Sequence, residues 1–267
     1  MLGQDVVRAA RFVNHEVTAL DRDALDVTNE RAVRRAIARE RPAAVVNCAA
    51  YTAVDAAEDE PGAATRLNAE AAGIVAAAAA EVGSCVVYPS TDYVFDGTGD
   101  RPYVESDEPS PRTVYGQTKL AGEAECAASN PRHFLVRTSW LFGTGGRNFV
   151  ETMLDIGARD GSVLVVRDQV GCPTWTGHLA AGIVRLLDTD GYGLHHMSAQ
   201  GQCSWYDFAV AIFEAAGVEC SVLSTTTAEF DRPAPRPAYS VLGTQWQDAI
   251  HLPDWEVGLR GYLEDRA

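Results

Sequence analysis

Lysine is almost absent from this sequence: its 22 basic residues include a single lysine, Lys119, and the others are arginines. Acidic residues number 37, so the chain carries a net charge of −15 at pH 7 and has a pI near 4.7. An excess of negative charge repels the phosphate backbone of nucleic acids. The composition therefore argues against non-specific nucleic-acid binding, and we expect no nucleic-acid partner.

Long apolar runs and paired cysteine motifs are also missing. No apolar run approaches the ~20 residues of a membrane span, and the sequence has no signal-peptide pattern, so we expect no membrane partner and a cytoplasmic protein. The chain has no Cys-x-x-Cys pair and no cysteine–histidine spacing typical of zinc. We expect free, mostly buried thiols in a reducing compartment. The six cysteines occupy positions 48, 85, 126, 172, 203 and 220.

Strand-like and helix-like segments alternate along the chain. Short apolar runs at 43–48, 84–88 and 133–138 predict buried parallel strands, and helical segments at 62–82 and 114–129 separate them. This rhythm predicts an α/β fold, a doubly wound parallel sheet of the Rossmann-like kind with a smaller α+β substrate-binding lobe. Further helices are expected at 2–12, 28–41, 148–158, 176–188 and 204–216, and further strands at 15–20, 163–166 and 193–197.

The pattern indicates two lobes without a separating linker. We expect residues 1–145, together with about 163–190, to form a dinucleotide-binding lobe. Residues 146–162 and 191–267 would form the smaller substrate-binding lobe. No Pro/Gly-rich linker separates the two parts, so we expect the second lobe to lean on the first and to complete a cleft.

The single lysine lies four residues after Tyr115, and residues at i and i+4 share one face of a helix. An ammonium close to a phenol lowers the pKa of the phenol. A surface lysine that happens to follow a tyrosine is the alternative. A nicotinamide-dependent carbonyl reductase needs a proton donor, a second hydrogen-bond donor and a cation. Tyr115, Thr91 and Lys119 supply this set, which favours catalysis.

Several polar groups follow predicted strands, where open α/β sheets bind ligands. Asp21 is placed to accept ribose hydroxyls and Arg22 to bind a 2′-phosphate, or the pair only caps a turn. Asp26 and Val27 follow in a loop and would approach an adenine, or they form a helix-entry turn. The segment 47–52 contains small residues that allow a cofactor to lie against the backbone, or that only pack tightly against a helix.

These segments resemble the extended short-chain dehydrogenase/reductase superfamily and, within it, the dTDP-4-dehydrorhamnose reductase family, over essentially the whole chain. The Tyr-x-x-x-Lys pattern marks the superfamily. Three segments together point to this branch: Ser90-Thr-Asp-Tyr-Val-Phe95, Arg137-Thr-Ser-Trp140 and Asp168-Gln-Val-Gly-Cys-Pro-Thr174. Further matching segments are 25–28, 47–55, 114–123 and 236–240.

The resemblance implies reduction of the 4-keto group of dTDP-4-dehydro-L-rhamnose to dTDP-L-rhamnose by NADPH or NADH, with Tyr115 as proton donor. Lys119 would hold the nicotinamide ribose, and Thr91 would hydrogen-bond the carbonyl. Family members are often homodimers with a magnesium ion, for which we assign no residue. The dinucleotide would contact Met1, Leu2, Gly3, Asp21, Arg22, Asp26, Val27, Ala49, Ala50, Tyr51, Thr52, Tyr115 and Lys119, and the sugar would contact Thr91, Asp92, Tyr93 and Trp140.

Alternatives remain for several of these roles. Trp140 could be a hydrophobic anchor, and Asp168, Gln169 and Arg236 could be lobe-stabilising hydrogen-bond groups. Arg22 favours NADPH, whereas the adjacent Asp21 favours a free ribose hydroxyl. Two other functions stay open: a reductase of another nucleotide-linked 4-keto-6-deoxy sugar, and a non-catalytic dinucleotide-binding regulatory subunit.

The first residues depart from the family. Its members begin with a strand and a Gly-x-x-Gly-x-x-Gly turn that holds the pyrophosphate at a helix N-terminus. Here Gly3 matches the third glycine, and Met1 and Leu2 align inside the motif. We expect the first strand and most of the glycine-rich loop to be missing, either because the start is placed at an internal Met or through truncation. Such a chain would bind dinucleotide poorly or fold poorly.

Overall fold

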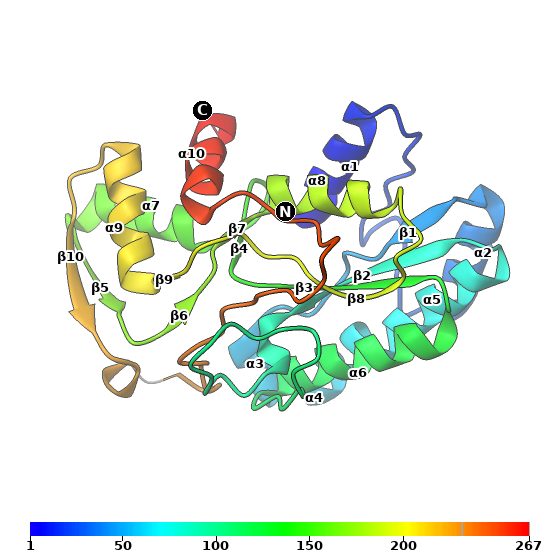
Figure 1. Cartoon of the computed structure of the whole chain (residues 1–267), viewed down its shortest axis with the longest axis horizontal. Coiled ribbons are helices and arrows are strands. Elements are labelled where there is room, and N and C mark those ends of the chain that lie inside the picture. The colour runs from blue at the N-terminus through cyan, green and yellow to red at the C-terminus, as the bar shows by residue number, and fades with distance from the viewer. Residues whose placement is uncertain (231, 267) are drawn as a thin grey trace.

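A computed structural model describes residues 1–230 and 232–266, and a parallel β-sheet lies at its centre (Figure 1). The strand order is β1-β2-β3-β8, and every neighbouring pair is parallel. The α/β class and the parallel sheet predicted from the sequence are therefore confirmed. The strands are β1 (Ala44–Val46), β2 (Cys85–Thr91), β3 (His133–Thr138) and β8 (Gly193–His196).

Helices cover both faces of this sheet because side chains alternate along its strands. Cys85 and Val87 of β2 pack in one apolar cluster, and Val86 and Tyr88 pack in another. In Figure 1 one helical layer lies above the sheet and the other below it. The upper layer consists of α1 (Leu2–Phe12) and α8 (Thr176–Leu186), and the lower layer of α2 (Glu30–Glu40), α5 (Ala71–Glu81) and α6 (Val114–Ser129).

A nearly continuous helical run follows β1. It consists of α3 (Val54–Asp59), α4 (Pro61–Thr65), the π-helical turn η1 (Arg66–Glu70) and α5, so the helix predicted at 62–82 is present with a π turn inside it. Alanine side chains of α5 are buried against the neighbouring helices and β2. Small side chains allow this close approach.

A second group of elements packs beside the sheet, at the left of Figure 1. Its aromatic core includes Phe142, Phe208 and Tyr262, all of which are buried. The group contains α7 (Phe149–Asp160), α9 (Trp205–Ala216), α10 (Trp255–Arg266), the parallel pair β5 (Ser162–Val166) and β10 (Ser221–Thr225), the pair β4 (Leu141–Phe142) and β7 (Thr174–Trp175), the pair β6 (Val170–Gly171) and β9 (Cys203–Ser204), and η3 (Thr227–Glu229).

The strand predicted at 15–20 is wrong. These residues form no strand, and most of them are exposed. A strand requires a neighbour for its backbone hydrogen bonds, and within the described ranges β1 pairs on one side, with β2. The N-cap of α2 is Asn29, one residue later than expected, because its side chain accepts the Ala32 N–H at 3.1 Å. The hypothesis of a missing first strand stays a prediction.

The elements divide the chain differently from the two expected lobes. Strand β8, which was expected in the second lobe, pairs with β3 in the main sheet, because α8 packs against α1 and returns the chain to that edge. Strand β5, which was expected in the first lobe, instead pairs with β10. None of the helices in the described ranges has the length and apolar character that crossing a bilayer requires.

Candidate active site

Helix α6 places Tyr115 and Lys119 beside the carboxyl end of β2. The helix begins at Thr113, whose Oγ1 accepts the Gly116 N–H at 3.0 Å. Gly116 permits a close approach to η2 (Asp92–Val94), since a Cβ at this position would overlap the Tyr93 carbonyl group. The i,i+4 relation of Tyr115 and Lys119 puts both side chains on the face that meets β2.

Tyr115 is half-buried as a residue, and its ring contacts the Tyr93 ring edge to face, with 5.6 Å between ring centroids. Burial raises the pKa of Tyr115 to about 12, the Thr91 hydroxyl opposes this shift, and the Asp92 charge adds to it. The net pKa of Tyr115 is thus raised by burial, and the prediction that Lys119 lowers it stays a prediction. The Lys119 Nζ is directed elsewhere, toward a backbone carbonyl, so desolvation dominates the titration of the phenol.

Thr91 and Asp92 end β2 in a hydrogen-bonded turn. The Thr91 Oγ1 donates to Asp92 Oδ1 at 3.0 Å and accepts the Tyr93 N–H at 3.2 Å. Asp92 is 2% exposed, and its Oδ2 has no partner among the described residues. Burial raises the pKa of Asp92 to about 6, although the nearby hydroxyls of Ser240 and Thr91 oppose the shift. The Oδ2 atom is itself shielded from solvent, so it has an unmet capacity for one hydrogen bond at the carboxyl end of β2.

Lys119 is 2% exposed and held by β2. Its Nζ donates to the Pro89 carbonyl at 2.7 Å and lies 3.8 Å from the centroid of the Tyr88 ring. Burial lowers the pKa of Lys119 to about 7, and the Glu123 carboxylate opposes that shift. A buried ammonium with remaining donor capacity can bind the hydroxyls of a ribose.

The segment after β1 has features that suit a dinucleotide. Ala49 and Ala50 leave the backbone accessible, and the buried Nδ2 of Asn47 has no partner among the described residues. Tyr51 is anchored by Asn68, which accepts the Tyr51 N–H at 2.8 Å and donates to its carbonyl at 3.1 Å. An unpartnered buried amide beside small residues fits a polar ligand. Thr52 follows on the exposed side of this segment.

The beginning of α1 lies at the same edge of the sheet. A Cβ on Gly3 would lie 3.5 Å from the Cβ of Cys48, and Met1 packs against Gly146. Leu2 packs with the apolar cluster between α1, α8 and the sheet. The structure thus places these three predicted contacts near the carboxyl end of β1.

Four of the predicted dinucleotide contacts lie in the turns that precede α2. They are Asp21, Arg22, Asp26 and Val27. The Asp21 Oδ1 accepts the N–H groups of residues 23 and 24, and the Asp26 Oδ1 accepts both the N–H and the hydroxyl of Thr28. The hydrogen bonds from Thr28 lower the pKa of Asp26. Both carboxylates close turns, Arg22 is exposed beside them, and Val27 packs against the lower helical layer.

Trp140 lies where β3 leaves the sheet. Its φ is +48°, and its ring stacks on Trp205 with 3.5 Å between centroids and 4° between planes. A Cβ on Gly171 would overlap the Trp140 indole, so the glycine makes room for it. A left-handed non-glycine backbone is sparsely populated and clusters at functional sites. Trp140 is therefore anchored by Trp205. It also lies between the main sheet and the second group of elements.

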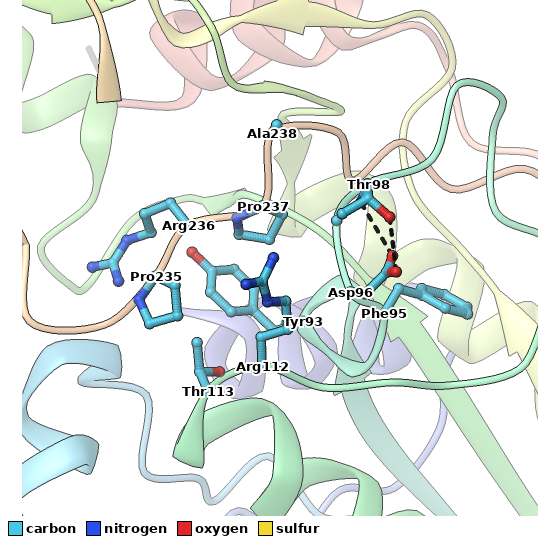
Figure 2. Close-up of a pocket in the computed structure, with 11 residues that line it drawn as sticks. Tyr93, Phe95, Asp96, Thr98, Arg112, Thr113, Pro235, Arg236, Pro237 and Ala238 are labelled. Carbon is cyan, nitrogen blue, oxygen red and sulfur yellow. Dashed lines mark hydrogen bonds between the residues drawn. The ribbon is translucent and has the colours of Figure 1, made fainter. Parts of the chain in front are cut away.

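A pocket lies beside Tyr93, and two arginines line it (Figure 2). The sequence did not predict that these arginines would share a site. Tyr93, Arg112 and Arg236 line it together with Pro235 and Pro237. Arg236 also donates to Asp55 Oδ2 at 2.8 Å, which fixes the 234–236 segment against α3. Asp96 also lines the pocket, and among the described residues Arg112 is the lining guanidinium without an ion-pair partner, so it could attract an anion.

Asp168 and Gln169 take the structural role that was left open for them. The Asp168 carboxylate accepts the N–H and the hydroxyl of Thr227, and Gln169 Nε2 donates to the same hydroxyl at 3.0 Å. Both residues thereby fix η3. Over residues 1–230 and 232–266, no three His, Cys, Asp or Glu side chains come together as a metal-ligand set, so no residue is assigned to magnesium.

Comparisons with known proteins cover the whole chain. A family model described as the RmlD substrate binding domain matches residues 1–267. A dTDP-4-dehydrorhamnose reductase of Streptomyces griseus is 44% identical over 97% of this chain and 88% of its own length. A probable dTDP-4,6-dihydroxy-2-methyloxan-3-one 4-ketoreductase of Streptomyces antibioticus is 45% identical over 99% of this chain and 92% of its own. A crystal structure of dTDP-4-dehydrorhamnose reductase from Bacillus anthracis in complex with NADP is 38% identical, covers 99% of this chain and 95% of its own, and superposes with a TM-score of 0.96.

Proposed function

The chain belongs to the RmlD family of dTDP-4-dehydrorhamnose reductases, and from this membership we propose that it is an NAD(P)H-dependent reductase of the 4-keto group of a dTDP-linked sugar. The substrate that we place first is dTDP-4-dehydro-L-rhamnose, with dTDP-L-rhamnose as product. The observation that carries the proposal is the convergence of Tyr115, Thr91 and Lys119 at the carboxyl end of β2.

Tyr115 is the proton donor of this reaction. Carbonyl reduction adds a hydride to carbon and a proton to oxygen, and the chemistry that a reduced nicotinamide supplies is the hydride. A phenol with a pKa of about 12 remains a much stronger acid than the secondary alcohol that forms, so proton transfer from Tyr115 to the developing alkoxide is downhill. The Thr91 hydroxyl donates a second hydrogen bond to the same oxygen when it turns away from Asp92.

Lys119 and the segment after β1 hold the dinucleotide. The Lys119 ammonium binds the ribose hydroxyls next to the reacting ring, and the amide of Asn47 and the backbone of Ala49 and Ala50 contact the rest of that half. Lys119 also attracts negative charge that forms on Tyr115 after it releases its proton. The relative from Bacillus anthracis holds NADP, which favours NADPH as the first cofactor to assay.

The sugar nucleotide lies between the two groups of elements. We assign Asp92 to a sugar hydroxyl because its buried Oδ2 lacks a hydrogen-bond partner among the described residues, and Trp140 forms one wall of the sugar site. The pocket of Arg112 and Arg236 lies against Tyr93, which itself contacts Tyr115, so it is within reach of the same ligand (Figure 2). We assign this pocket to the diphosphate, because Arg112 supplies positive charge beside Tyr93 and Arg236 lies on the same pocket wall.

The test is NADPH and NADH oxidation by the purified chain with dTDP-4-dehydro-L-rhamnose, with the product identified by mass spectrometry and NMR. Tyr206→Phe serves as the matched control, since Tyr206 lies on α9 and is not part of the site. Reduction by the wild type and by Tyr206→Phe, and its loss in Tyr115→Phe, supports the proposal. A folded protein that binds dinucleotide but reduces no dTDP-4-keto sugar would contradict the proposed reductase function and favour a regulatory subunit.

A second substrate is favoured by one relative. The Streptomyces antibioticus protein is named for a different dTDP-linked 4-keto sugar. It is 45% identical to this chain, and the Streptomyces griseus dTDP-4-dehydrorhamnose reductase is 44% identical. The alternative is therefore a reductase of another nucleotide-linked 4-keto-6-deoxy sugar. Comparing kcat/KM for both sugars decides between them, because the ratio reports the difference in transition-state binding.

A further inference from the structure

Glu123 lies one helical turn beyond Lys119 on α6, in a buried ion pair that the proposed reaction does not use. Its Oε1 accepts the Ser90 hydroxyl at 2.5 Å and the Arg137 Nε at 2.9 Å, and its Oε2 accepts the Arg137 Nη2 at 2.7 Å. The side chains of Arg137 and Glu123 are 3% and 5% exposed. Desolvating such a pair costs about as much as the attraction returns, so stability alone is a weak reason for it.

The pair is in register with the proposed catalytic residues. Tyr115, Lys119 and Glu123 follow each other at i, i+4 and i+8 along one face of α6. Two consecutive residues of β2 hold the last two: the Pro89 carbonyl accepts Lys119, and the Ser90 hydroxyl donates to Glu123. Strand and helix therefore fix the ammonium and the carboxylate relative to each other.

The other titratable groups that face Lys119 are neutral at pH 7. They are Cys48 just after β1, Tyr88 of β2 and Cys126 of α6, and burial raises the pKa of each of them. Glu123 is thus the negative charge near the ammonium, and Arg137 of β3 lies on the far side of that carboxylate. Burial works against the ammonium, and Glu123 offsets part of that cost.

We propose that Glu123, fixed by Ser90 and Arg137, is a positioning residue that keeps the Lys119 ammonium charged beside the dinucleotide site. Its consequence for turnover rests on the proposed function, whereas its effect on the charge of Lys119 does not. A neutral amine at this position would no longer attract the Tyr115 phenolate. It would also have one hydrogen-bond donor fewer than the ammonium. The carboxylate would therefore influence the reaction without touching either ligand.

The sequence makes a direct test possible because Lys119 is its one lysine. Protein grown with ¹³Cε-labelled lysine gives a single side-chain signal, whose titration reports the pKa of Lys119. We would compare the wild type with Glu123→Gln, Glu123→Asp, Arg137→Met and Glu125→Gln. Glu125 is the matched control, since it lies on the exposed side of the same helix.

The expected shifts differ in sign. Glu123→Gln lowers the pKa of Lys119 by about 1 or more, because the carboxylate is lost and Arg137 is left unneutralised. Arg137→Met raises it, because Glu123 then interacts with Lys119 alone. Glu123→Asp and Glu125→Gln leave it near the wild-type value. A merely structural pair would not shift the pKa in opposite directions.

The pH dependence of kcat/KM gives the catalytic readout. If turnover requires the charged lysine, the alkaline limb moves to lower pH in Glu123→Gln and returns in Glu123→Asp. An unshifted lysine signal in folded Glu123→Gln would overturn the proposal, and so would a neutral Lys119 in the wild type from pH 5 upward, which requires no variant to fold. Because the titration uses no substrate, its result stands whether or not the chain is a reductase.

Discussion

At the residue scale, Asp92 combines a binding role with a cost in stability. It is buried with one unpartnered oxygen, and burial raises its pKa to about 6. In the unfolded chain an aspartate titrates near ~3.9. Between these two values the folded state binds more protons than the unfolded state, so the contribution of Asp92 to stability falls as the pH rises through this window.

Asp92→Asn should therefore stabilise the protein while it weakens the sugar site. We expect a gain of about 1–3 kcal/mol in the free energy of unfolding above about pH 7, since the buried charge is removed. The gain should shrink to less than half of that near about pH 4.5, where the wild-type carboxyl is already protonated in the folded state. Urea unfolding at both pH values measures this, and an equal change at the two would contradict the argument.

Tyr115→Phe should separate proton donation from binding. Phenylalanine keeps the ring that packs against Tyr93 but has no proton to give. We expect turnover to fall by about 10²-fold or more, with the affinity for NADPH changed little. Steady-state kinetics measures the turnover, and calorimetric titration measures the affinity for NADPH. Turnover near that of the wild type would show that Tyr115 is not the proton donor.

The sequence predicts those parts of the site that depend on local spacing. Tyr115 and Lys119 are four residues apart on one helix, so their juxtaposition follows from helix geometry. Arg112 and Arg236 line one pocket only because the fold brings distant segments together. The anchoring role of Asn68 was not predicted, since a single asparagine in η1, just before the alanine-rich α5, gives no signal except its departure from the surrounding composition.

At the element scale, the approach of α6 to β2 and to the π-helical turn depends on Gly122. A Cβ there would overlap the Asn68 carbonyl oxygen and the Tyr88 hydroxyl, both of which are fixed by hydrogen bonds. We expect Gly122→Ala to cost about 1–3 kcal/mol or more. Thermal unfolding compares it with Gly62→Ala on exposed α4, where nothing lies within 4 Å of the new Cβ and stability should stay level or rise slightly. Equal effects at the two sites would contradict this account.

Whole elements were predictable where burial gives a strong pattern. The strands at 84–88 and 133–138 are apolar on both faces, and both appear in the sheet. The segment at 15–20 has a strand-like composition, but strand formation depends on a pairing partner rather than on the segment itself. The half-exposed strand β10 and the mixed helix α10 were missed for the opposite reason, because their patterns are weak.

At the scale of the whole molecule, the net charge of −15 should make stability depend on salt. Self-repulsion favours expansion, and added ions screen it. The ion pairs that salt would weaken are mostly exposed ones, which contribute little. We expect Tm to rise by a few degrees between about 10 mM and about 0.5 M NaCl. Calorimetry tests this, and a falling Tm would show that attractive pairs dominate. The homodimer stays a prediction.

The burial of Lys119 gives the folded surface an unusual chemical property. A reagent that acylates amines finds no lysine side chain there, since the one that the sequence contains is 2% exposed beneath β2. Acylation of Lys119 therefore requires the side chains that cover its Nζ to move aside. Mass-spectrometric counting of that single adduct over time would measure how often the site opens, with no introduced probe.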